Sequence, residues 1–299
     1  MQEENLAGPT TRWECGSIIT RRCFVLDSSV RRGLDGASML WPRKLRPSSW
    51  AAALAPRLAH SPLANPWLIG RLVELGGNRV TTDGLTFSLD NPRITTRDKS
   101  MVYLGRHEVP ELALVHAHLV ADLPVIELGG GIGFVSCYIN RNLAHPCDHI
   151  VVEANPELIP TLEINRRLNR REFQIRSAAL AYGPEETVLA IRSWVVSMVG
   201  GHGTRQVPVA TTTLAQLLRE SGFAHINLVV DIEGGEADLV EHEGRVLSER
   251  VRTLILETHP PFTGEERAAR MIAAIGALGF AEVGRAQRVL AFDNLALAP

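Results

Sequence analysis

Five stretches of the sequence that are typical of strands carry a polar residue at or near their carboxyl end. The polar residues at these ends are Glu127, Glu153, Ser177, Asp231 and Glu257. In an open parallel sheet the carboxyl ends of the strands meet at one edge, and ligands bind there. We therefore expect these side chains to surround a single site.

A glycine-rich turn follows the first of these stretches. It contains Gly129, Gly131 and Gly133, and a helix-like run from Phe134 to Leu143 comes next. Such a turn lets a ligand approach bare backbone at a helix N-terminus, where free N–H groups favour polar or anionic groups. A dinucleotide fingerprint would need a small residue in place of Phe134. The pattern E-x-G-x-G-x-G instead resembles the first motif of class I S-adenosylmethionine (SAM) methyltransferases.

Glu153 comes 26 positions after Glu127, about one strand–helix–strand unit further along the chain. A carboxylate at this place can accept hydrogen bonds from both ribose hydroxyls of a nucleoside. The alternative is an acid that caps the junction between strand and helix. Because the glycine turn precedes it, we favour the ribose role.

Further motifs make the resemblance more specific. Residues 103–259 resemble the FkbM family of SAM-dependent methyltransferases. The matching segments are Glu127-Leu-Gly-Gly-Gly-Ile-Gly133, Val152-Glu-Ala-Asn-Pro-Glu157, Thr213-Leu-Ala-Gln-Leu217, Val230-Asp-Ile-Glu-Gly-Gly-Glu236 and Leu256-Glu-Thr-His259. The fourth segment is similar to the family's D-x-E-G-x-E signature. The resemblance implies the class I fold, SAM as cofactor, and O-methylation of a sugar or secondary metabolite.

The resemblance also implies roles for individual residues. The methionine end of SAM would be held by Glu127, Gly129, Gly131 and Gly133. Glu153 would hold the ribose, and Ala154 and Ser177 would border the adenine. The family's first motif is usually D-x-G-A-N-x-G, so Glu127 replaces an aspartate and Gly131 an asparagine. The missing amide leaves the acceptor open, whereas SAM binding is still expected.

Asp231, Glu257 and His259 are the candidates for catalysis. Asp231 could pair with the SAM ammonium or orient the acceptor, or it could cap a helix that starts near Gly234. A neutral imidazole at His259 could remove the proton from an acceptor hydroxyl, but a histidine before two prolines is as often a loop residue. The three side chains could also hold Mg²⁺. Since spacing alone does not bring them together, we expect no metal site.

An insert at residues 192–202 mixes bulky apolar residues with a Gly-Gly pair. It could act as a lid that excludes water from a sulfonium reaction. Trp194 and Tyr182 could face the sulfonium by cation–π attraction, although simple core packing is favoured for each aromatic alone. Glu233 and Glu236 are expected to bond backbone groups at the turn after Asp231.

The order of elements predicts an α/β fold: a Rossmann-like, doubly wound class I methyltransferase sheet at 121–299. Strands are expected at 149–154, 173–178, 226–231 and 251–257, with short extra strands at 188–191 and 207–209. Asn155 and Pro156 would begin the helix after the second core strand. The chain would end with an antiparallel hairpin at 280–283 and 289–292. Residues 1–120 are expected to form an N-terminal α+β extension or lid with a β-hairpin at 79–89, turning at Asp83-Gly84, and a helix at 108–119.

Composition narrows the range of partners. The 299-residue chain has a net charge of −2, whereas nucleic-acid binders are normally basic. No stretch reaches the roughly 18 apolar residues of a membrane span, and the acidic N-terminus does not fit a signal peptide. We expect a cytoplasmic protein with reduced cysteines, because none of the four forms a C-x-x-C pair. Segment 12–57, with nine basic and three acidic residues, could dock an acidic carrier or a phosphorylated substrate, but a solvated surface is favoured.

The leading function is a SAM-dependent methyltransferase acting on a small molecule, free or carrier-bound, as a monomer or a dimer. A second reading comes from FkbM-like enzymes that close SAM's own aminobutyl chain to azetidine-2-carboxylate and release methylthioadenosine. Such a site needs no separate acceptor. A third reading, a non-catalytic SAM-binding module, is disfavoured by the full set of strand-end acids.

Overall fold

The computed structural model describes residues 65–193, 197–199 and 205–297. All of them belong to one compact unit, Leu45–Pro299, so the expected boundary near residue 120 falls inside this unit. The basic segment 12–57 and the side chains of Cys15, Cys23 and Trp194 lie outside the described residues. None of the described helices is long and apolar enough to cross a membrane.

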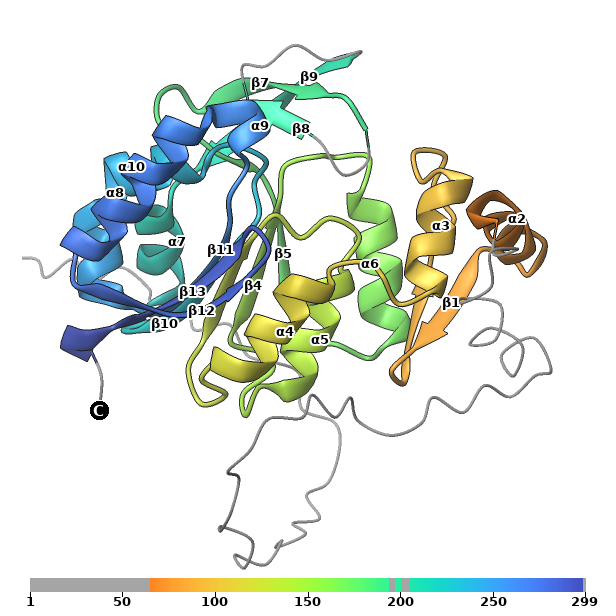
Figure 1. Cartoon of the computed structure of the whole chain (residues 1–299), viewed down its shortest axis with the longest axis horizontal. Helices are drawn as coiled ribbons and strands as arrows, with labels where there is room; N and C mark the ends of the chain where they lie inside the picture. The colour runs from red at the N-terminus through yellow and green to blue at the C-terminus, as the bar shows by residue number, and fades with distance from the viewer. Residues whose placement is uncertain (1–64, 194–196, 200–204, 298–299) are drawn as a thin grey trace, which may run out of the picture. The chain divides into compact units, whose positions relative to one another are not determined.

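The central sheet has seven strands in the order β12-β13-β11-β10-β3-β4-β5 (Figure 1). The bounds are β3 Val125–Leu128, β4 His149–Glu153, β5 Gln174–Ser177, β10 Ile226–Val230, β11 Val251–Glu257, β12 Phe280–Ala286 and β13 Val289–Asn294. The first five in chain order pair in parallel, and β13 is antiparallel to both β11 and β12. This order reverses beside β3 and ends in an antiparallel hairpin. The expected class I methyltransferase fold is confirmed.

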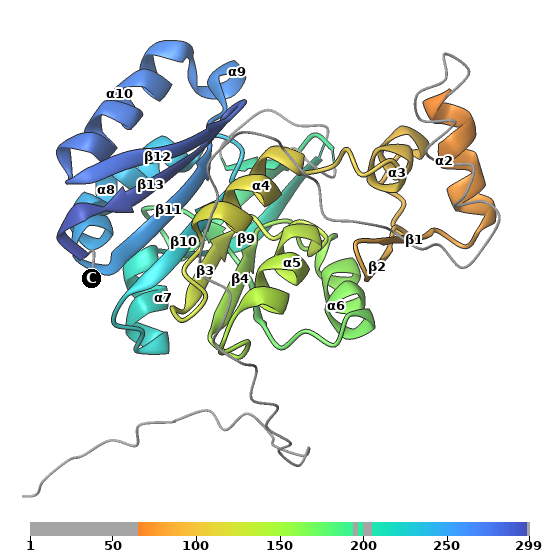
Figure 2. The same cartoon turned by 60° about the horizontal axis from the view of Figure 1, so that its bottom comes forward.

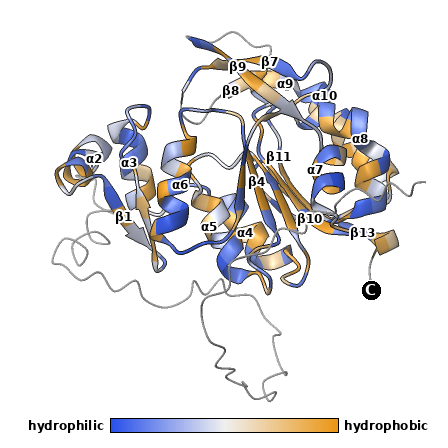
Figure 3. Cartoon of the chain, turned by 180° about the vertical axis from the view of Figure 1, so that it is seen from behind, coloured by the Kyte–Doolittle hydropathy of each residue, from blue (hydrophilic) through white to orange (hydrophobic). Residues whose placement is uncertain are grey.

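Helices cover both faces of the sheet (Figure 2). One face carries α4 Val109–His118, α5 Phe134–Asn142 and α6 Ile159–Leu168, and the other carries α7 Leu214–Ser221, α8 Glu236–Arg250 and α10 Glu265–Ala277. Within β3, Val125 packs into the first layer, while Ile126 and Leu128 pack into the second. Strands buried on both faces must be apolar at nearly every position, and the hydropathy colouring shows this (Figure 3).

A second, four-stranded sheet stands over the carboxyl ends of the central strands (Figure 1). Its order is β6-β9-β7-β8, with β6 Ala179–Leu180, β7 Glu186–Ile191, β8 Ser197–Val199 and β9 Arg205–Thr212. The two extra strands expected at 188–191 and 207–209 are confirmed as parts of β7 and β9. The described strands of this second sheet therefore roof the edge of the central sheet at which ligands bind in this fold.

The first described elements are α2 Pro66–Leu75, the hairpin β1 Arg79–Thr82 and β2 Leu85–Ser88, and α3 Thr96–Tyr103. The hairpin turns at Asp83 and Gly84, as expected, and both have positive φ. Asn165 of α6 and Asn169, which directly follows α6, attach β2: the backbone N–H of Ser88 donates to Asn165 Oδ1 at 2.7 Å, and that of Thr86 to Asn169 Oδ1 at 2.8 Å. Helices α2 and α3 were not expected from the sequence.

One helix start differs from the expectation. Helix α6 begins at Ile159 rather than at Pro156, and no side chain caps it. Asn155 instead closes a turn, because its Oδ1 accepts the N–H of Glu157 at 3.0 Å. Its own N–H is bound by the carboxylate of Glu153 at 2.6 Å. Asn155 is held by the end of strand β4 and is not free to start a helix.

Candidate functional site

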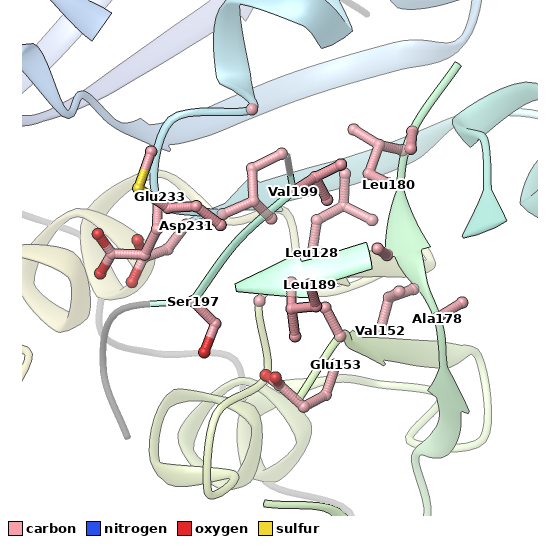
Figure 4. Close-up of a pocket in the computed structure, with 18 of the residues that line it drawn as sticks. Leu128, Val152, Glu153, Ala178, Leu180, Leu189, Ser197, Val199, Asp231 and Glu233 are labelled. Carbon is pink, nitrogen blue, oxygen red and sulfur yellow. The ribbon is translucent and has the colours of Figure 1, made fainter. Parts of the chain in front are cut away.

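A cavity of about 380 Å³ lies at the carboxyl ends of β3, β4 and β10, below the roof of β7 and β8. Asp231 and Glu233 lie on one side of it and Glu153 on another, with aliphatic side chains such as Leu128 and Leu189 between them (Figure 4). Tyr182 also lines this space and stacks on His242 at 4.2 Å between ring centres. The cavity thus combines separate polar corners with an apolar, partly aromatic wall.

The three glycines of the turn after β3 have different structural tasks. Gly129 has φ +96°, and a Cβ there would lie 1.7 Å from the backbone oxygen of Asp231. Gly133 allows α5 to approach α6, since its Cβ would meet Leu162 at 2.6 Å. At Gly131, with φ +53°, a Cβ would meet nothing within 4 Å. Gly129 and Gly133 serve packing, and Gly131 borders open space where a ligand can reach the backbone.

Glu153 joins the two loops beside the cavity. Its Oε2 accepts the N–H of Gly131 and its Oε1 that of Asn155, each at 2.6 Å. Burial raises the pKa of this carboxyl to about 7, although the two backbone N–H groups act in the opposite direction. Each oxygen retains a lone pair for a further donor. This geometry agrees with the predicted ribose role, which stays a prediction.

Three residues predicted for the cofactor, Glu127, Gly133 and Ser177, do not line the cavity. Glu127 is 2% exposed and is bonded by Ser136 Oγ at 2.8 Å and His149 Nε2 at 3.1 Å, on the far side of the glycine turn. Ser177 is exposed, and Ala178 lines the cavity instead. Successive side chains of a strand point to opposite faces, so a side chain next to a cavity-lining residue points away from the cavity. Ala154, Gly129, Gly131, Glu153 and Asp231 do line the cavity, whereas Gly133 does not.

His259 is held among acids of the loop after β10. Its Nδ1 lies 2.8 Å from Glu236, and its Nε2 lies 3.4 Å from both Asp231 and Glu233. Burial alone would lower the pKa of His259, but the hydrogen bond to Glu236 and the neighbouring carboxylates raise it to about 9. This raised pKa favours the protonated ring at pH 7, whereas the sequence analysis considered a neutral imidazole as the base. Neither His259 nor Glu257 lines the cavity.

Two further acids join this cluster: Glu108, directly before α4, and Glu111 in its first turn. One carboxylate oxygen from each of Glu108, Glu111 and Asp231 lies within 4.8 Å of the other two. A second set within the same distance consists of one carboxylate oxygen each from Asp231 and Glu257 and a ring nitrogen of His259. Burial, followed by the charge of Glu108, raises the pKa of Asp231 well above its usual range. Burial also raises the pKa of Glu233, to about 7, against the opposing effect of His259. The site therefore contains more acids than its one imidazolium can neutralise.

Sequence reasoning assigned no role in the site to Glu108, Glu111 or Glu233. Glu236 was expected to bond the backbone and does so, accepting the N–H groups of Ile232 and Gly234. Glu233 has φ +54° and faces the cavity instead. The available signal was the position of Glu233 in the turn after β10 and the Glu-x-x-Glu spacing at the start of α4.

A family model described as the methyltransferase FkbM domain matches residues 127–282, more than half of the chain. The chain belongs to the FkbM methyltransferase family. The match begins at Glu127, ahead of the glycine turn, and ends within β12, so it includes both Glu153 and the acidic cluster after β10. The α4 acids Glu108 and Glu111 lie outside it. No protein of curated function matches the chain.

Several solved structures are distantly similar. Fibrillarin from Aeropyrum pernix, with natively bound SAM, is 13% identical with a TM-score of 0.38, over 61% of this chain and 73% of that one. A ribosomal protein L11 methylase from Lactobacillus delbrueckii subsp. bulgaricus is 15% identical with a TM-score of 0.35, over 63% and 78%. A tRNA (uracil-54, C5)-methyltransferase from Pyrococcus abyssi, in complex with S-adenosyl-L-homocysteine, is 13% identical with a TM-score of 0.41, over 72% and 43%. Similarity at this level carries no argument about the substrate.

Proposed function

We propose that this FkbM-family chain transfers the methyl group of SAM to a hydroxyl group of a small sugar or secondary metabolite, free or carrier-bound. One observation carries the proposal: a single cavity holds Glu153, whose two oxygens are fixed by backbone N–H groups, and, on another side, the acids Asp231 and Glu233, whose pKa values burial raises above their usual range. The first suits a cofactor, and the second suits proton removal.

The residues around Glu153 fit the nucleoside part of SAM. Glu153 accepts the ribose hydroxyls, because each of its oxygens is held in place by one backbone N–H and retains a free lone pair. Ala154 and Ala178 border the adenine, and both are small enough to admit a flat ring. The open space beside Gly131 receives the chain that leads to the sulfonium. SAM, when bound, supplies an activated methyl group.

Glu233 is the residue that takes the acceptor's proton. It lines the cavity, and its pKa of about 7 makes it ionised in a useful fraction of molecules at neutral pH. His259 acts through it: the imidazolium lies 3.4 Å from a carboxylate oxygen of Glu233 and lowers its pKa. Asp231, at the same distance from the ring, orients the acceptor or the ammonium of SAM.

The acidic cluster argues against cyclisation of SAM. To attack its own carbon chain, the amine must be neutral, and carboxylates beside it stabilise the charged ammonium instead. The test is to incubate the pure protein with SAM alone and with a panel of hydroxylated sugars and metabolites, and to identify the nucleosides by mass spectrometry. We expect S-adenosylhomocysteine only when an acceptor is present. Methylthioadenosine above the spontaneous background, from SAM alone, would refute the proposal.

A further inference from the structure

Glu111 is a buried acid without a partner. It is 5% exposed, it lines the cavity, and it sits in the first turn of α4. No residue in the described ranges donates a hydrogen bond to it or forms an ion pair with it. The charges that act on it belong to carboxylates: Glu108, Asp231, Glu127 and Glu257. A buried carboxyl surrounded by other carboxyls is costly to ionise, and burial raises the pKa of Glu111; a bound cation would let it ionise.

Two neighbours complete a set of oxygen donors around Glu111. Glu108, the residue before α4, and Asp231, the residue after β10, each place a carboxylate oxygen within 4.8 Å of one on Glu111. One oxygen of Asp231, Oδ1, is buried and accepts no hydrogen bond in the described parts of the chain, although His259 Nε2 lies 3.4 Å from it. Glu108 has φ +52°, and its Oε1 lies 3.3 Å from His107 Nδ1. Two chain segments more than a hundred residues apart thus bring three carboxylates together, and Glu111 is the one without a cationic neighbour among the described residues.

We propose that Glu108, Glu111 and Asp231 bind a divalent metal ion of the Mg²⁺ type at the edge of the cavity. Mg²⁺ and Mn²⁺ prefer carboxylate and water oxygens, and a few carboxylates with open positions suffice. A single monovalent ammonium would leave most of the negative charge of the three carboxylates unbalanced. The site goes beyond methyl transfer, since it requires neither SAM nor an acceptor.

The alternative set of Asp231, Glu257 and His259 is less suited to the ion. The Nδ1 of His259 is already bonded to Glu236, and its Nε2 faces both Asp231 and Glu233. Both ring nitrogens of His259 are therefore already paired with carboxylates, whereas the carboxyl of Glu111 has no hydrogen-bond donor or cation beside it among the described residues. The unpartnered acid identifies the set on α4 as the metal site.

The test is binding of Mn²⁺ to the untagged, full-length protein without SAM, followed by electron paramagnetic resonance and by calorimetry. We expect one Mn²⁺ per chain in the micromolar to low-millimolar range, displaced by Mg²⁺. Glu111→Gln and Glu108→Gln should each weaken the affinity at least tenfold. Glu266→Gln removes an exposed acid on α10 that pairs with Arg270, and it should leave the affinity unchanged. Circular dichroism confirms that each variant is folded.

Three outcomes would overturn the site. The first is no saturable Mn²⁺ binding by the wild-type protein at ~10 mM ion, beyond the weakest calcium-type sites. The second is unchanged affinity in a folded Glu111→Gln variant. The third is a larger loss in Glu257→Gln than in Glu111→Gln, which would place the ion on the histidine set. If Mn²⁺ fails to bind but Glu111→Gln weakens SAM binding, the cluster receives the SAM ammonium instead, and the proposed methyl transfer still stands.

Discussion

Replacing Glu153 tests the cofactor site most directly. In Glu153→Ala, the N–H groups of Gly131 and Asn155 lose their acceptor, and so do the ribose hydroxyls of SAM. An unpaired buried hydrogen-bonding group costs about 1–3 kcal/mol. SAM affinity should therefore fall about 5- to 150-fold. The free energy of unfolding should also fall, because the N–H of Asn155 loses its acceptor. The loss should stay near about 2 kcal/mol, since water in the cavity can reach the N–H of Gly131.

Glu153→Gln sharpens the test, because the amide resembles the protonated acid. The burial-raised pKa of about 7 means that the carboxyl takes up a proton as the pH falls below neutrality. Ribose hydroxyls donate to the charged form, so SAM lowers the pKa of Glu153 in the complex. Affinity should rise with pH between the two pKa values, by at most about tenfold per pH unit. The amide cannot titrate, so the affinity ratio of wild type to variant should grow from pH 6 to pH 8 and then level off.

The assay is calorimetry with SAM at pH 6, 7 and 8, with unfolding by urea measured on the same preparations. Glu163→Gln, on the exposed side of α6, serves as the matched control, since its carboxylate only approaches Arg167 at 3.8 Å. Wild-type affinity in a folded Glu153→Ala variant would refute the ribose assignment. A ratio between wild type and Glu153→Gln that does not change with pH would show that the carboxylate does not titrate against the ligand.

Other substitutions test other parts of the reasoning. His259→Gln removes the imidazolium that lowers the pKa of Glu233, so the acidic limb of the pH–kcat profile should move to higher pH. If the variant instead lost the acidic limb altogether, His259 itself would be the base. Gly129→Ala places a Cβ against Asp231, at a φ that disfavours side chains, and should lower unfolding free energy by about 2–4 kcal/mol and impair SAM binding; a normal melting temperature would contradict the packing role. Asn165→Leu strands backbone groups of β2 and of the glycine turn and should cost about 2–5 kcal/mol in urea unfolding, whereas a loss below about 1 kcal/mol would mean that the hairpin is held by its apolar contacts.

The elements of the fold could be predicted because their signals are local. Each core strand is a short apolar run, and Asp83-Gly84 provides the turn chemistry of a hairpin. The start of α6 was missed for a reason that is not local. Asn155 has the side chain of a helix cap, but the carboxylate of Glu153 takes its N–H and holds it in a turn. Tertiary hydrogen bonds override the local preference at this position.

The side chains of the site were harder to assign because the side of the sheet to which a residue points depends on its exact position in the strand. A strand exposes alternate residues to opposite layers, so an error of one position moves a residue from the cavity to the far side. This explains why Ala178 and not Ser177 lines the cavity, and why Glu127 points to His149. Of the five strand-end residues, only Glu153 at the end of β4 and Asp231 after β10 line the cavity, so position at a strand end predicted the edge of the sheet but not the facing.

The protonation of the site follows only from the assembled fold. His259 alone has the chemistry of a base near neutral pH. Its pKa rises because Glu236, Glu233 and Asp231, which follow β10, lie beside the ring that follows β11. The charge of Glu108, directly before α4, acts in turn on Asp231. Helix α4 precedes the first core strand, so the excess of negative charge arises where segments far apart in sequence meet. Either protonation of the carboxyls or a cation removes that excess, and the candidate cations are the imidazolium, the SAM ammonium and the proposed metal ion. A cation bound at Glu108 and Glu111 adds positive charge beside the remaining carboxyls and should lower their pKa values. The pH at which methyl transfer begins should therefore fall when this cation is bound.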